Sequence, residues 1–75
     1  MEVYVLEGYL PNEGTSDILG VYENPDVPMD QVQRLHPGIL WTEYETYSVS
    51  DTIDAKIYYI QKHEVILDEI PIIRN

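Results

Sequence analysis

Residues 1–10, MEVYVLEGYL, form the stretch of this sequence that decides its fold. Most of them are β-branched, aromatic or aliphatic, and none is proline, which is the composition of a β-strand. Because side chains alternate between the two faces of a strand, Val3 and Val5 point one way and Tyr4 and Leu6 the other. Both faces are largely apolar, so we expect this strand to lie inside a sheet rather than at its edge.

The next segment supplies a partner for this strand. Turn-forming residues 11–16, PNEGTS, lead into a second strand over residues 17–23, DILGVYE. The connection is too short for a parallel crossover, which predicts that the two strands pair antiparallel. Alternation along the second strand predicts that Ile18, Gly20 and Tyr22 share one face.

One helix is predicted, over residues 27–36, VPMDQVQRLH. Pro28 suits a first-turn position, where its missing N–H removes no helical hydrogen bond. Pro28, Val32 and Leu35 then form a narrow apolar stripe that faces the sheet. The Pro-Gly pair at residues 37–38 ends the helix. A helix this short is marginal alone and must pack on the sheet.

The second half of the chain adds strands. Residues 39–49, ILWTEYETYSV, indicate a third strand and residues 56–67, KIYYIQKHEVIL, a fourth, with a turn over residues 50–54 between them. An apolar tail, IPII at residues 70–73, follows. The predicted fold is α+β, an antiparallel sheet of four to five strands with one short helix on one face (β-β-α-β-β), in a single domain spanning residues 1–75.

Composition narrows the function classes. Fourteen acidic residues against four basic ones give a formal charge of −10 at pH 7. This balance argues against binding to nucleic acid or to anionic membranes, which depends on Lys and Arg. Cysteine is absent, which excludes disulfides and thiolate metal sites and fits a reducing cytosol. No basic leader or long apolar run is seen, so we expect a cytoplasmic protein outside the membrane.

Catalytic and metal-binding signatures are also missing from the sequence. His36 and His63 stand 27 positions apart, without the close spacing of metal ligands. No serine lies in a G-x-S-x-G elbow, and the glycines form no phosphate-binding loop. Glu43 and Glu45 have strand spacing that would suit a carboxylate pair, but a solvated strand face explains them more simply. We therefore predict no enzyme activity, metal or cofactor.

The surplus of negative charge favours binding to another protein that has a basic surface. Carboxylates at two-residue strand spacing repeat about every 7 Å, close to two phosphate steps of DNA. Aromatic residues between them are of the types that anchor interfaces. The predicted partner-binding residues are Glu43, Glu45, Asp51, Asp54, Trp41, Tyr44 and Tyr47. A second acidic patch on the first hairpin comprises Glu2, Glu7, Glu13, Asp17 and Glu23.

Other interpretations of the same features stay open. The charges would serve solubility alone if they are simply solvated. A structural or regulatory homodimer is the main alternative, with an apolar subunit contact at Ile70, Ile72 and Ile73. A small-ligand site is the third, and its cavity would be lined by the tyrosine rings of Tyr22, Tyr44, Tyr58 and Tyr59.

Three segments, VYVLEG, ILGVYE and YIQKHEVILDE, resemble those of small uncharacterised phage and bacterial proteins, which begin with a hydrophobic strand, a "GVY" strand and a helix. The resemblance covers mainly residues 3–23 and 58–69, and the helix here is shorter and poorer in Ala, Glu and Lys. It implies a small accessory protein of phage origin and supplies no site residues. The sharpest hypothesis is a phage-type inhibitor that occupies a basic groove of a host nucleic-acid-handling or defence protein in the host cytoplasm.

Overall fold

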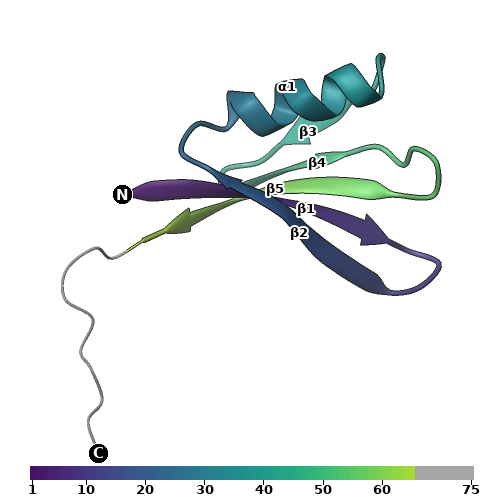
Figure 1. Ribbon diagram of the computed structural model, residues 1–75, viewed down its shortest axis with the longest axis horizontal. Coiled ribbons are helices and arrows are strands. Elements are labelled where there is room, and N and C mark those ends of the chain that lie inside the picture. Colours follow the sequence, from purple (N-terminus) through teal and green to yellow (C-terminus); the bar gives the residue numbers. More distant parts are fainter. Residues whose placement is uncertain (66–75) are drawn as a thin grey trace, which may run out of the picture.

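A computed structural model describes residues 1–65 of the chain (Figure 1). The elements in chain order are β1 (Glu2–Leu10), β2 (Thr15–Tyr22), α1 (Asp26–Leu35), β3 (Trp41–Glu43), β4 (Tyr47–Ser50) and β5 (Ile57–Glu64). The five strands form one antiparallel sheet in the spatial order β2-β1-β5-β4-β3, and α1 lies across one face of it (Figure 1). The predicted α+β class is therefore confirmed.

β1 lies inside the sheet, as its two apolar faces predict. It pairs with β2 on one side and with β5 on the other, both antiparallel. Leu6, at its centre, is buried and stands opposite Ile60 of β5. The backbones of Met1 and Val65 join the ends of the two strands, because the Val65 N–H donates to the Met1 carbonyl at 2.7 Å.

β2 contains an irregularity that the alternation pattern did not predict. Its register against β1 shifts between Leu6 and Glu7, so that Leu19 has no opposing residue. An extra residue of this kind is a β-bulge, and it interrupts the alternation of side chains. Ile18 and Tyr22 consequently lie on opposite faces of the sheet, so the prediction that they share a face is wrong.

The predicted third strand, residues 39–49, is in fact a hairpin. β3 ends at Glu43 and β4 begins at Tyr47, and the Tyr44 N–H donates to the Tyr47 carbonyl at 2.7 Å to close the turn. This turn contains no Gly, Pro or Asn, the residues that usually mark one. Its sequence, alternating carboxylate and aromatic residues, therefore looks like continuous strand.

The core lies between α1 and the sheet. Its buried members are Leu6, Val32, Ile39, Tyr58 and Ile60, and Pro28 is buried beside them.

The apolar stripe of α1 differs from the prediction at its last position. Pro28 and Val32 are buried, but Leu35 is 70% exposed. The buried row follows i, i+4 spacing, and its next position is His36, whose ring Nε2 lies 3.1 Å from the Tyr58 hydroxyl. His36, half-buried just after the helix, takes the place predicted for Leu35.

Truncation of the helix's central core residue tests this packing. Val32→Ala removes two methyl groups from a fully buried position, and we expect it to lower the free energy of unfolding by about 2 kcal/mol. Val27→Ala, on the exposed side of the same helix, should change it by less than about 0.5 kcal/mol. Urea denaturation followed by circular dichroism measures both, and equal losses would contradict the assignment of the core.

Candidate functional site

The sheet face opposite α1 is the candidate site. The helix covers the face that carries Leu6, Tyr58 and Ile60, and among residues 1–65 no element packs against the other (Figure 1). We call this second surface the open face. By strand alternation and register, its central side chains are Val3, Val5, Tyr9, Tyr47, Ile57 and Tyr59.

Four tyrosine rings cross the open face in a chain of contacts, which we call the tyrosine ladder. Tyr9 of β1 meets Tyr59 of β5 edge to face, with ring centroids 6.5 Å apart. Tyr59 in turn lies 6.4 Å from Tyr47 of β4, and Tyr47 stacks on Tyr44 at 4.8 Å. These distances are those of favourable aromatic pairs. The ladder therefore presents a fixed aromatic strip across three strands and one turn.

A shallow hollow of about 240 Å³ lies at the β1 end of the tyrosine ladder, lined by Glu7, Tyr9, Ser16, Tyr59 and Gln61. The Gln61 side-chain amide donates to the Glu7 carboxylate at 2.9 Å and holds it in place. Glu7 is itself half-buried. Small-molecule pockets usually exceed about 300 Å³, so the hollow suits one side chain of a binding partner better than a whole ligand.

Glu43 and Glu45 do not form the predicted row of carboxylates. Glu43 is the last residue of β3 and stands opposite Ser48, on the α1 side of the sheet. Glu45 lies beyond the strand, in the turn before β4. Both line a second hollow of about 160 Å³, which also includes Lys62. The two-residue spacing along one strand face is therefore lost at the turn.

Asp51 and Asp54 have local structural contacts. The Asp51 carboxylate accepts a hydrogen bond from the Leu40 backbone N–H at 3.2 Å. The backbone N–H of Asp51 in turn donates to the Leu40 carbonyl at 3.0 Å. Asp54 sits in the tight turn before β5 with φ of 51°, and its carboxylate is 3.9 Å from the His36 ring. Neither lies in a row with Glu43 or Glu45.

The predicted aromatic anchors divide between the two sides of the sheet. Tyr44 and Tyr47 belong to the tyrosine ladder, whereas Trp41 packs against the core under α1. The four tyrosines proposed to line a ligand cavity divide in the same way. Tyr22 and Tyr58 lie on the α1 side, and Tyr44 and Tyr59 on the open side, so these rings do not converge.

Ile70, Ile72 and Ile73, the predicted subunit contact, lie outside the residues that the structure describes.

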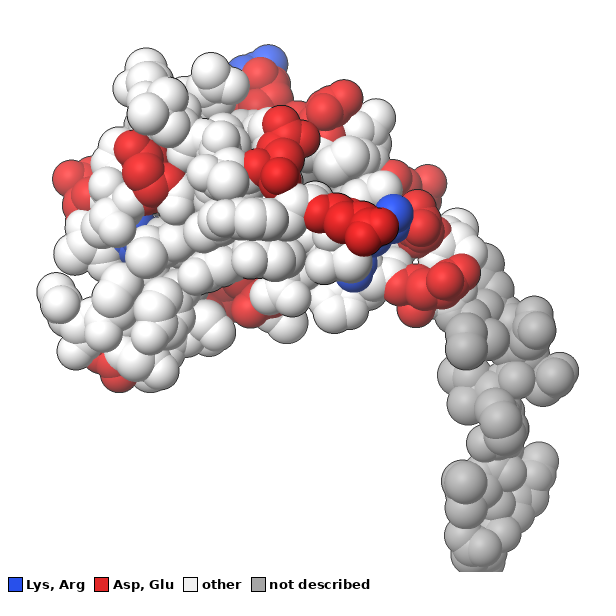
Figure 2. Space-filling model, turned by 180° about the vertical axis from the view of Figure 1, so that it is seen from behind, with Lys and Arg blue, Asp and Glu red and all other residues white. Residues whose placement is uncertain are grey.

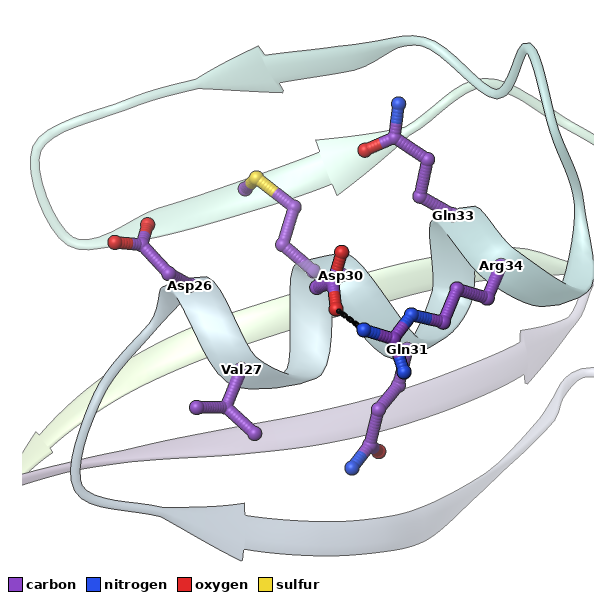
Figure 3. A pocket seen from close by; sticks show the side chains of 7 residues that line it. Asp26, Val27, Asp30, Gln31, Gln33 and Arg34 are labelled. Atoms are coloured by element: carbon purple, nitrogen blue, oxygen red, sulfur yellow. Dashed lines mark ion pairs between the residues drawn. The ribbon is translucent and has the colours of Figure 1, made fainter.

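A third hollow, of about 640 Å³, follows the outer surface of α1 (Figure 3). All seven of its lining residues belong to this one helix. Figure 3 shows Val27 and Gln31 pointing to one side of the helix and Asp26 and Gln33 to the other. No opposing element supplies a second wall, so this surface has no enclosed site.

The acidic residues of the described part of the chain do not gather in one continuous patch on the face drawn in Figure 2. On the side seen in Figure 2, they form several separate groups with uncharged surface between them. Lys62 lies 3.3 Å from Glu2, and Arg34 lies 2.9 Å from Asp30. The hydrogen bond to Glu2 and its negative charge raise the pKa of Lys62 above the usual lysine value.

Comparison of the chain with protein-family models, curated proteins and solved structures finds no match. Within residues 1–65, no helix is long and apolar enough to cross a membrane. The same residues contain no group of three or more His, Cys, Asp or Glu side chains placed to hold a metal ion. The open face must therefore be interpreted from its own geometry.

Sequence reasoning placed Glu7 only in a general acidic patch and Tyr59 only in the alternative ligand cavity, and it did not select Tyr9 or Gln61. Glu7 and Tyr9 stand two residues apart in one strand, as do Tyr59 and Gln61 in another. Strand alternation therefore indicated that the members of each pair share a face. What brings Glu7 beside Gln61, 54 positions away, is the antiparallel register of β1 and β5, which the sequence pattern does not specify.

The pKa of Lys62 offers a direct test of its contact with Glu2. In Glu2→Gln, we expect that pKa to fall towards the usual lysine value, because the charged acceptor is lost. Because the pKa of Lys62 is higher in the folded than in the unfolded protein, its contact with Glu2 stabilises the fold fully at pH values below the unfolded-state pKa. This stabilisation disappears as the pH rises through the folded-state pKa. NMR titration of the Lys62 side chain measures the shift. Glu45→Gln, a weaker neighbour, is the control and should cause a smaller fall.

Proposed function

We propose that this protein is an acidic protein-binding module whose open face holds a partner with a basic, arginine-bearing surface. The observation that carries the proposal is the tyrosine ladder, on a sheet face that no element within residues 1–65 covers, in a chain with a formal charge of −10. Guanidinium groups stack on tyrosine rings. Negative charge attracts such a partner over distance and speeds encounter at low salt.

The hollow beside Glu7 is the proposed anchor point. One oxygen of its carboxylate accepts the hydrogen bond from Gln61, and a carboxylate offers about four acceptor positions in total. An incoming guanidinium would pair with the remaining acceptors while it lies against Tyr9 and Tyr59. Glu7 is half-buried, so salt screens this pair less than it screens a fully exposed one.

A narrower form of the proposal is the phage-type inhibitor that fills the basic groove of a host nucleic-acid-handling or defence protein. The net charge of the chain supports this narrower form as well. The mimicry of a phosphate row has weaker support, because Glu43 lies in β3 and Glu45 in the following turn. We therefore place the contact on the open face and not on the predicted acidic row.

A second copy of the chain is the alternative occupant of the open face, and the apolar side chains of Val3, Val5 and Ile57 favour it. Two subunits of charge −10 would repel each other, which opposes this contact at low salt. Sedimentation at several protein concentrations separates the two cases. If the protein forms a stable dimer and Val5→Lys dissociates it, the occupant of the open face is a second copy of the chain and not the proposed basic partner.

Removal of one charge tests the anchor point. With a synthetic hexa-arginine peptide as the probe, we expect Glu7→Gln to weaken binding about tenfold, the loss of one charge-assisted hydrogen bond. Glu43→Gln makes the same change of charge outside the open face and should weaken binding less than twofold. Calorimetric titration measures both affinities, and equal effects would show that only net charge matters.

Removal of one ring tests the tyrosine ladder. Tyr47 is partly exposed, so Tyr47→Leu should leave the fold intact and weaken binding of the hexa-arginine peptide about fivefold. Tyr22→Leu, on the α1 side, is the control and should retain the wild-type affinity. A hexalysine peptide should bind more weakly than hexa-arginine, and an oligothymidine strand should not bind. Peptide-induced NMR shifts confined to α1 would contradict the proposed site.

The natural partner can be sought with the same variants. Wild-type protein and Tyr47→Leu serve as parallel baits in a lysate of the native host, and mass spectrometry compares what they retain. Proteins that bind the wild type and not the variant are the candidates for further study.

A further inference from the structure

The outer edge of β2 is a second surface with unusual properties. β2 is the end strand of the sheet, with β1 as its one neighbour among the described residues. It has eight residues, and those from Thr15 to Leu19 are exposed. The opposite edge strand, β3, has only three residues. A long exposed edge presents a row of backbone donors and acceptors to which another strand can pair.

The usual protection of such an edge is weak in β2. Charged side chains, especially Lys, and Pro commonly block edge pairing, and the sequence of β2, TSDILGVY, contains no Lys or Pro and a single charged residue, Asp17. The bulge at Leu19 is one protective feature. The segment from Thr15 to Ile18 nevertheless pairs with β1 in regular register, and its outer edge is therefore regular too.

The side chains along this edge indicate what would pair with it. On the open face, Ile18 is 69% exposed and Val21 59% exposed. Asp17 lies on the α1 side, opposite Gly8. On the open face, apolar side chains of an added strand would lie beside Ile18 and Val21. The alternate side chains of that strand would point to the α1 side and lie beside Asp17. Both sets would be within the usual cross-strand distance of about 5 Å.

Charge determines which residues of the added strand suit the positions beside Asp17, on the α1 side. Glu13 lies in the turn before β2 and Glu23 directly after it, and none of the four Lys and Arg residues occurs in residues 1–33. Basic side chains would complement Asp17 and these flanking acids. A second copy of β2 would instead bring the same acidic groups together, and like charges across a strand pair are destabilising.

We infer that the β2 edge binds an extended segment of a partner protein, in which apolar and basic residues alternate and which adds to the sheet as a sixth strand. This mode of recognition gains affinity from main-chain hydrogen bonds and specificity from alternate side chains. It uses a surface other than the tyrosine ladder, and it goes beyond the proposed function because either site can fail without the other.

The test uses an end-blocked seven-residue peptide of alternating valine and lysine as the probe. We expect it to slow hydrogen exchange of the backbone amides of β2 that point away from β1, which fall at every second residue in the regular segment from Thr15 to Ile18. The peptide with glutamate in place of lysine should not bind. Protection of amides in β4 or β5 instead, or equal binding of both peptides, would overturn the inference.

Two protein variants complete the test. Ile18→Lys places a charge on the edge and should weaken binding of the valine–lysine peptide at least tenfold. Leu35→Lys adds the same charge at an equally exposed apolar position of α1, and it should weaken binding no more than about twofold. Tyr47→Leu should bind this peptide normally, which separates the edge from the tyrosine ladder. A stable dimer of the free protein that Ile18→Lys dissociates would show a second copy at the edge and overturn the inference.

Discussion

The packing of one helical row on one face of the sheet is the interaction on which this structure depends. Val32 of α1 packs in one cluster with Leu6, Tyr58 and Ile60. Pro28, one turn earlier, is also buried, and His36, just after the helix, contacts Tyr58. Few other side chains of the described residues are buried, so this contact provides most of the core. A ten-residue helix is marginal in isolation, and the sheet in turn needs the helix to exclude water from its apolar face.

The same constraint explains why one face of the sheet carries no covering element within residues 1–65. One short helix covers one face of a five-stranded sheet, and among the described residues no element covers the second face, which carries Val3, Val5 and the tyrosine ladder. The ladder keeps these rings ordered through contacts among themselves, which limits the side-chain entropy lost on binding. A high net charge of one sign generally favours solubility and opposes self-association.

Much of the fold could be predicted from local sequence, because local chemistry decided it. The two apolar faces of residues 1–10 predicted an internal strand, and the Pro-Gly pair at residues 37–38 predicted the end of the helix. The bulge at Leu19 could not be predicted, since it depends on the pairing of β2 with β1. The turn at residues 44–46 lacks turn-forming residues, and so one strand was expected where the chain makes two.

The residues of the candidate site also differ in whether local sequence could identify them. Tyr44 and Tyr47 were found because they are aromatic and close in sequence, but Trp41 has the same character and is packed under the helix. Glu7 and Gln61 become a site only through strand register. The placement of Trp41 has a practical consequence. As the single tryptophan, it is a built-in fluorescent reporter of the helix–sheet interior, on the side of the sheet away from the tyrosine ladder.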